Sequence, residues 1–261
     1  MRLAAALVLG ALSVSGARAV TLKPETAQAF DRYIRETEAR LERRLAPGGR
    51  FLWVDEEPQR AASVRQGQLA IENRSGSDFV PVSGGLIHDW IGAVFVPGVT
   101  LRETLALVQD YDHHQDIYKP EVLASRLVSR HGNDFQVHLR LMKRKVITVV
   151  LDTDYDVRYF PLDGGRCHSR AYSTRIAEVR NAGQRDERIL PPGQDEGFLW
   201  RLYSYWRFQE RDGGVYVECE AISLTRAIPA GLGWLVEPII TTLPRESLAN
   251  TLRETRTALQ K

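Results

Sequence analysis

The distribution of apolar residues at the amino end predicts an export signal. Met1 and Arg2 precede an apolar run from Leu3 to Leu12, and Ala17-Arg18-Ala19 fits the small-x-small pattern of a cleavage site. The apolar run is well short of the roughly 20 residues that a membrane-spanning helix needs. We therefore expect residues 1–19 to be a signal peptide, cut after Ala19, and the product to be secreted or periplasmic.

A helical period follows in residues 20–49. Apolar and small positions recur three or four residues apart, and they form one stripe: Phe30, Ile34, Thr37, Leu41 and Leu45. Pro24 suits the first helical position, and Gly48 and Gly49 end the pattern. We expect this helical arm to pack on the main domain, with a helix that binds a partner as the alternative.

The period changes to two in the remaining chain, residues 50–261, which we predict to be one domain. Alternation from Val64 to Ile71 predicts a strand that ends at Asn73–Ser77, and a second strand is predicted at Leu86–Val96. Thr100 with Glu103 forms a capping box at the start of a short helix. Further strands are predicted between turn residues, at Val122–Ser129, Asp134–Lys143, Val146–Phe160, Cys167–Val179, Phe198–Gln209 and Val215–Thr225. Such a run of neighbouring strands indicates an antiparallel meander.

The chain ends in a predicted helix that begins at Pro244 and needs a cover for its apolar side. Its apolar face carries Leu248, Leu252, Thr255 and Leu259. Two of the predicted strands offer such a cover, because every second residue points to the same face of a sheet. On this alternation the inward set is Phe198, Trp200, Leu202, Ser204, Trp206 and Phe208, with the smaller Val215, Val217, Cys219 and Ala221 beside it.

Composition narrows the classes of protein. With 261 residues, 43% of them apolar and 26% charged, the chain is neither disordered nor a polytopic membrane protein. Of its 35 Lys and Arg residues, two lie in the predicted signal peptide, so 33 cations remain against 33 anions. A nearly neutral protein gives no reason to expect a nucleic-acid partner.

No pattern of residues predicts a catalytic centre, a metal or a cofactor. The run from Asp110 to Asp116 holds two histidines and three aspartates, but its spacing matches no metal motif, so we expect a polar loop. His88 and Asp89 are adjacent in a strand and therefore point to opposite faces, which excludes a simple dyad. Cys167 and Cys219 lie on strands separated by a third, so we expect two free thiols, with a disulfide as the alternative.

Three segments carry a resemblance to a known family: Tyr203–Phe208, Cys219–Leu224, and Gly231–Leu235 followed by Pro244–Leu248. They resemble exported bacterial proteins of the START-like (SRPBCC) superfamily, and the resemblance extends over roughly Val64 to Leu259. It implies an α+β helix-grip fold, in which a curved antiparallel sheet wraps a long C-terminal helix and encloses an elongated apolar cavity. Members use this cavity for lipids, sterols, polyketides or plant hormones, and some are cyclases or hydroxylase subunits.

We therefore expect a carrier that binds a small hydrophobic or amphipathic ligand in an internal cavity. The predicted ligand-binding residues are Trp90, Tyr111, Arg140, Trp200, Leu202, Trp206 and Val217, with Tyr111 or Arg140 orienting the polar end of the ligand. An amphipathic stretch at Gly231–Thr242 is expected to close the cavity, with peripheral contact to a membrane as the alternative.

Two other functions stay open. A cyclase or dehydratase would use His88 or Tyr111 as general acid or base, and ionisable groups with perturbed pKa values in a deep pocket would favour it. A purely apolar lining would favour a carrier. An envelope interaction module would use the stripe from Phe30 to Leu45, and a projecting helix with that stripe exposed would favour it.

Overall fold

The computed structural model describes residues 21–144, 148–227 and 233–261, and for residues 233–241 it describes the backbone alone. The predicted signal peptide lies outside these ranges, as do the side chains of most of the segment Gly231–Thr242. Within the described residues, no helix is both long and apolar enough to cross a membrane.

One antiparallel sheet forms the centre of the molecule. Its strands are β1 (Ala70–Asn73), β2 (Val80–Val82), β3 (Gly85–Pro97), β4 (Val122–His131), β5 (Asp134–Arg144), β6 (Thr148–Asp163), β7 (Arg166–Arg180), β8 (Arg188–Ile189), β9 (Arg201–Arg211) and β10 (Gly214–Arg226). The main order is β1-β3-β10-β9-β7-β6-β5-β4, so the predicted meander is confirmed from β4 to β10. Its last strand returns to pair with β3.

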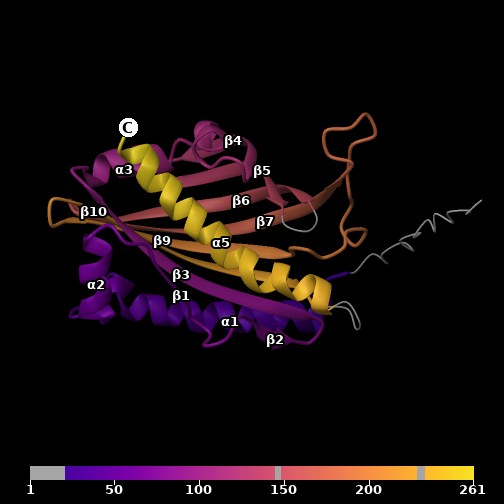
Figure 1. Ribbon diagram of the computed structural model, residues 1–261, viewed down its shortest axis with the longest axis horizontal. Coiled ribbons are helices and arrows are strands. Elements are labelled where there is room, and N and C mark those ends of the chain that lie inside the picture. Colours follow the sequence, from indigo (N-terminus) through magenta and orange to yellow (C-terminus); the bar gives the residue numbers. More distant parts are fainter. Residues whose placement is uncertain (1–20, 145–147, 228–232) are drawn as a thin grey trace, which may run out of the picture.

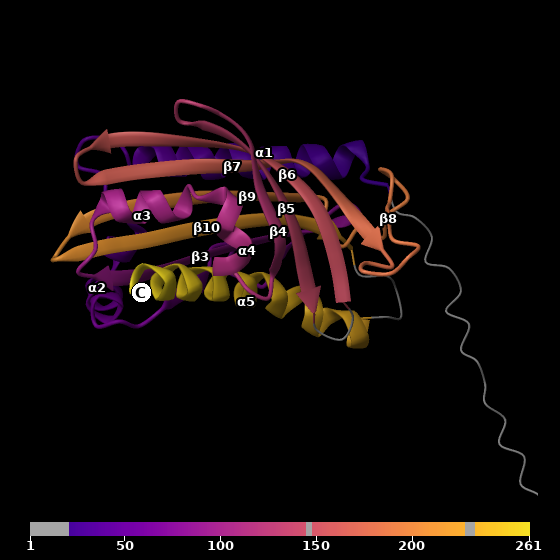
Figure 2. The same ribbon diagram turned by 90° about the horizontal axis from the view of Figure 1, so that it is seen from above.

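Helices cover both faces of this sheet. They are α1 (Pro24–Arg43), α2 (Pro58–Arg65), α3 (Leu101–Val108), α4 (His114–Ile117) and α5 (Gly233–Leu259), with short 3₁₀ turns at Trp53–Glu56 and Tyr111–His113. Figure 1 shows α5 crossing the concave face of the sheet at an angle, and Figure 2 shows α1 on the opposite side. A curved sheet that wraps a long C-terminal helix is the helix-grip α+β fold, as predicted.

The concave face and α5 share the main core. Leu248 and Leu252 of α5 pack with Val94 of β3, Val217 of β10 and Phe208 of β9. The predicted capping box at the start of α3 is confirmed, since the Thr100 side chain accepts from the Glu103 N–H and Glu103 accepts from the Thr100 N–H.

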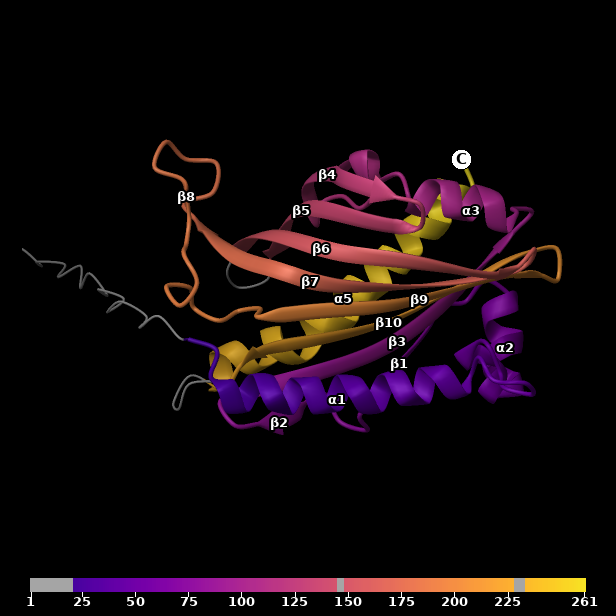
Figure 3. The same cartoon turned by 180° about the vertical axis from the view of Figure 1, so that it is seen from behind.

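The helical arm is docked on the convex face, as predicted. Figure 3 shows α1 running along the back of the sheet. Phe30, Ile34 and Leu41 are buried against Ile222 and Leu224 of β10, and Pro24 stands at the start of the helix. These residues of the apolar stripe of α1 are therefore buried in the contact between the helix and the sheet.

Buried ion pairs hold α1 beside this apolar contact. Glu218 and Glu220 of β10 are each only 2% exposed, and they face Arg44 and Arg40. The Arg44 guanidinium lies 3.1 Å from Glu218, and Arg40 donates two hydrogen bonds to Glu220. Tyr33 donates to Asp89 at 2.8 Å, and burial raises the pKa of Asp89 well above its ordinary value.

Some element boundaries were predicted wrongly, among them the start of the strand predicted from Phe198, which begins at Arg201. Val64 and Arg65 end helix α2 instead of starting a strand, because Pro58 begins a helix there and Val64 packs under β3 with Trp53. The C-terminal helix begins at Gly233, and its backbone stays helical through Pro238 and Pro244. A proline removes one N–H from the helix, but packing of α5 on β3 and β10 holds the helix in place.

The two cysteines lie as the strand order requires. Cys167 of β7 is opposite Phe208 and Cys219 of β10 is opposite Trp206, so β9 separates them. Both are buried free thiols, as predicted.

The ion pairs under α1 give a first testable prediction. Replacing Arg40 by methionine leaves the Glu220 carboxylate buried without its cation, and we expect the free energy of unfolding to fall by about 2 kcal/mol. The double variant Arg40→Met with Glu220→Gln should recover most of this loss. Urea unfolding measures both, with Arg35→Met on the exposed face of α1 as the control. An equal effect of Arg35→Met would contradict the role of the ion pair.

Candidate functional site

A cavity of about 340 Å³ lies between the concave face of the sheet and α5. This volume falls within the range of ligand sites, near its lower end. Most of the lining is apolar and comes from five strands and α5: Val137, Leu139 and Leu141 of β5, Leu151 and Val157 of β6, Ala171 of β7, Leu202, Trp206 and Phe208 of β9, Ala221 of β10, and Leu248 of α5.

The hollow follows from the register of three neighbouring strands. Ala221 of β10 is opposite Ser204 of β9, and Ser204 is opposite Ala171 of β7. All three side chains point into the cavity and none extends beyond one atom past Cβ. Protein interiors are normally close-packed, so a row of small side chains under a helix leaves space that no neighbour fills.

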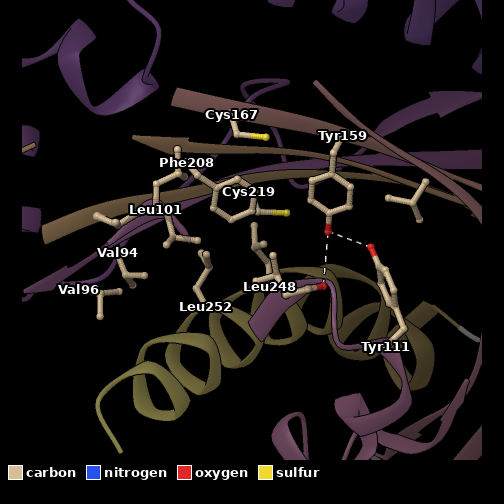
Figure 4. Packing of buried hydrophobic residues seen from close by; sticks show 14 of the residues in the cluster. Val94, Val96, Leu101, Tyr111, Tyr159, Cys167, Phe208, Cys219, Leu248 and Leu252 are labelled. Carbon is tan, nitrogen blue, oxygen red and sulfur yellow. Dashed lines mark hydrogen bonds between the residues drawn. The ribbon is translucent and has the colours of Figure 1, made fainter. Parts of the chain in front are cut away.

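Two tyrosines and a histidine form a polar cluster on the side of the cavity beside α3. The hydroxyls of Tyr111 and Tyr159 lie 2.9 Å apart, and the Tyr159 hydroxyl lies 3.4 Å from the Val108 carbonyl oxygen, as Figure 4 shows. The His114 Nε2 is 3.2 Å from the same carbonyl. These contacts tie the segment after α3 to β6 and leave the cluster internally hydrogen-bonded.

Burial shifts the pKa values of the tyrosines inside the cavity further toward the uncharged form. It raises the pKa of Tyr118 and of Tyr155 to about 12, and it also raises the pKa of Tyr111 and of Tyr159.

The two cavity histidines shift in the opposite direction. Burial lowers the pKa of His88 to about 4, although the backbone carbonyl of Asp78 opposes the shift. Burial likewise lowers the pKa of His114 to about 4, against the carbonyl of Val108. Both histidines are therefore neutral at pH 7, and the hollow offers hydrogen bonds without net charge.

Charged groups gather instead at the rim, between α5 and the end of β5. Lys143 forms an ion pair with Glu121 and donates to the Ser247 hydroxyl at 2.7 Å, and Asn250 donates to Glu121 at 2.9 Å. Burial has the largest single effect and raises the pKa of Glu121, but the Lys143 charge and the hydrogen bonds from Lys143, Asn250 and Ser247 together lower it by more, so the net shift is downward. The rim therefore carries a hydrogen-bonded pair of opposite charges.

Three of the predicted ligand-binding residues line the cavity: Tyr111, Leu202 and Trp206. Trp90 and Val217 are buried in the same core but lie beyond the lining, with Val217 fully enclosed. The structure therefore places these two in the solid part of the core.

Trp200 lies on the opposite side of the sheet from its predicted position. Its ring packs with Phe30 of α1 and with Tyr205, on the convex face. Strict alternation fails here because β9 begins only at Arg201, and the chain at Gly197 has a left-handed conformation (φ 71°) with the indole against it. Phe198 and Leu199 both line the cavity instead.

Arg140 does not face the cavity either. Leu139 and Leu141 both line it, so the residue between them on β5 points outward. There the Arg140 guanidinium lies 2.8 Å from Asp152 and 2.8 Å from Glu187. Its charge is paired at the surface, and it is not available to a ligand in the hollow.

Several cavity residues went unpredicted. Tyr155 and Tyr159 share the inward face of β6 with Val157, and their alternation was visible in the sequence. Ser204 and Ala221 were predicted to face inward, but the row that they form with Ala171 could not be recognised, because it exists only once the register of three strands is known.

The run from Asp110 to Asp116 separates into two environments. His113 is exposed and pairs with Asp110 at 2.8 Å, whereas His114 is buried at the cavity. No three His, Cys, Asp or Glu side chains in the described part of the chain are placed to hold a metal ion together. His88 and Asp89 point to opposite faces, His88 to the cavity and Asp89 to α1.

Comparison with solved structures finds distant similarities. A STAR-related lipid transfer protein from Xanthomonas axonopodis is 18% identical, with 71% of this chain and 100% of that one covered and a TM-score of 0.47. A START superfamily protein from Mycobacterium smegmatis is 11% identical over 66% and 97% of the two chains, at a TM-score of 0.44.

A third similar structure is the Zhui aromatase/cyclase from Streptomyces sp. R1128, 10% identical over 67% of this chain and 94% of that one, with a TM-score of 0.45. No protein-family model matches the sequence, and no curated protein matches it significantly. Such distant similarity concerns the START-like helix-grip fold alone.

The buried histidines predict a pH dependence of stability. The folded state holds the pKa of His114 at about 4, below its ordinary value of 6.5, so the unfolded chain binds the proton more readily. Stability must then fall as the pH drops through this window, by roughly 2 kcal/mol between pH 7 and pH 5 for one such histidine. In the His114→Gln variant this part of the loss should be absent, as urea unfolding at both pH values would show. An unchanged difference would contradict the neutral, buried state of His114.

Proposed function

We propose that this protein binds a small apolar or amphipathic molecule in the cavity under α5 and carries it. The observation that carries the proposal is the hollow itself, about 340 Å³ lined mainly by aliphatic and aromatic side chains. Burial of apolar ligand surface contributes about 25 cal/mol per Å², so such a lining supplies affinity without a charged contact. The ion pair of Lys143 and Glu121 at the rim suits a polar end that stays near water.

A cyclase or dehydratase is the second candidate function. The pocket does hold ionisable groups with perturbed pKa values, which was the expected mark of an enzyme. The direction of these pKa shifts favours a binding protein over an enzyme, however. A general acid or base works best with a pKa near the operating pH, whereas His88 and His114 have values of about 4 and Tyr111 lies above 10.

The third candidate, an envelope interaction module, loses its basis. It required the stripe of α1 to be free for a partner, and Phe30, Ile34 and Leu41 are instead buried against the sheet.

We place the carrier outside the cytoplasm, in the periplasm or secreted, because residues 1–19 carry the pattern of a cleavable signal peptide. Expression of the full chain in a bacterial host, followed by mass determination of the exported product, tests this placement. A mature protein that begins at Val20 is the expected result. Retention of the full-length chain in the cytoplasm would contradict it.

Filling the hollow tests the binding function. In Ala221→Leu, the added isopropyl group projects from the floor into the cavity, where it takes space from a ligand. We expect the wild-type protein, examined by native mass spectrometry after purification from its exporting host, to carry a stoichiometric apolar compound. The variant should carry less than about a tenth of the compound found on the wild-type protein.

The matched control is Ala39→Leu, which adds the same group on the exposed face of α1. It should leave the bound compound unchanged. If the wild-type protein carries no compound and takes up no apolar probe, the carrier function is wrong. Equal loading of the wild-type and Ala221→Leu proteins would show that ligand lies elsewhere.

A further inference from the structure

Three serine hydroxyls cross the apolar floor of the cavity in a line. Ser223 of β10 is opposite Leu202, and Ser204 stands two residues further along β9. Ser204 is opposite Ala171, and Ser169 stands two residues further along β7, opposite Trp206. We call Ser223, Ser204 and Ser169 the hydroxyl diagonal. Diagonal neighbours on adjacent strands lie about 7 Å apart, so the three oxygens are spread along the floor instead of meeting at one point.

These hydroxyls face the cavity without partners of their own. Ser169 is 2% exposed, Ser223 is 7% exposed and Ser204 is half-buried, and all three side chains line the cavity. Within the described ranges, no hydrogen bond engages the side chain of any of them. Ser173, by contrast, lies outside the lining and its hydroxyl accepts the Leu202 N–H at 3.0 Å.

The tyrosine hydroxyls of the cavity do not add to this set. The Tyr155 hydroxyl is fully enclosed by protein atoms, so a ligand in the hollow does not reach it. The other tyrosines of the cavity, Tyr111, Tyr118 and Tyr159, all have hydrogen-bond partners.

An unpaired hydroxyl in an apolar hollow is unfavourable, and a ligand oxygen that meets it removes that cost. Aliphatic chains offer no such oxygen along their length. An anion would offer oxygens, but no cation lies among the hydroxyls, since Lys119 and Lys143 are at the rim. The partner that fits is a neutral molecule with oxygen atoms along its body.

We propose that the hydroxyl diagonal selects an uncharged ligand bearing carbonyl or ether oxygens over a plain hydrocarbon or acyl chain. This specificity rests on the proposed binding function and names the chemistry of its ligand. The hydroxyls act as donors to the ligand, and the aromatic and aliphatic lining holds its body.

Two rigid tricyclic probes of similar shape test the proposal: xanthone, which carries a ketone and a ring ether, and anthracene, which carries no oxygen. Binding to the full mature chain is measured by quenching of tryptophan fluorescence and by calorimetry. We expect the wild-type protein to bind xanthone about tenfold or more tightly than anthracene, a preference that two unpaired hydroxyls can supply. In the triple variant Ser169→Ala, Ser204→Ala and Ser223→Ala, this preference should shrink to within about twofold, with anthracene bound as well as before.

The control variant is Ser173→Ala, which removes a buried serine hydroxyl of the same strand that does not face the cavity. It should leave the ratio of the two affinities unchanged. A triple variant that keeps the xanthone preference would overturn the proposal, as would a wild-type protein that binds both probes equally. In those two cases anthracene still binds, and the carrier function stands. Failure of both probes and of palmitate to bind the wild-type protein would overturn the carrier function and this inference together.

Discussion

Alternation along β10 is the constraint on which both halves of the molecule depend. Its inward positions carry Cys219, Ala221 and Ser223, side chains too small to reach α5, so the sheet and the helix enclose a hollow. Its outward positions carry Glu218 and Glu220, which would be buried charges without partners if α1 were absent. The helical arm and the cavity therefore depend on the same strand. One face of β10 forms the floor of the cavity, and the opposite face carries the two carboxylates that α1 covers. Arginines at the end of α1 neutralise them, and the apolar stripe of the helix completes the cover.

The register explains why the hollow survives in an otherwise close-packed core. Further along the same three strands, Val217, Phe208 and Cys167 lie opposite one another and pack with Val94 and Leu252. There the space under α5 is filled. Across the row of Ala221, Ser204 and Ala171 the strands and the helix keep their places, but the side chains shorten, and the deficit of volume becomes the cavity. The close packing at one end of the sheet thus stabilises the fold, whereas the small side chains at the other end leave the cavity under α5.

Periodicity in the sequence predicted the arm, the capped helix and the meander, because each depends on local patterns that span one element. It failed at Val64, where a proline-started helix looked like an alternating strand, and at Trp200, where alternation was extended past the real start of β9. The candidate site was predicted less well for a related reason. Leu202 and Trp206 were chosen as large inward residues and Tyr111 as a polar group for the end of the ligand, whereas the cavity owes its existence to small side chains. Alanine and serine carry no signal of their own until the strands that bear them are aligned.

The distribution of polar groups then decides what the hollow can accept. A charged group in the interior would be desolvated, which is unfavourable. Burial therefore favours the neutral form of the two histidines and lowers the pKa of His88 and of His114 to about 4. Charges persist at the rim, where Lys143 and Glu121 keep about a fifth of their surface in solvent and neutralise each other. A ligand must follow the same order, with uncharged oxygens toward the serines of the floor and any ionised group toward the rim. Such a gradient orients a molecule without a strong ion pair, and weak orienting contacts suit a carrier because they let the ligand leave again.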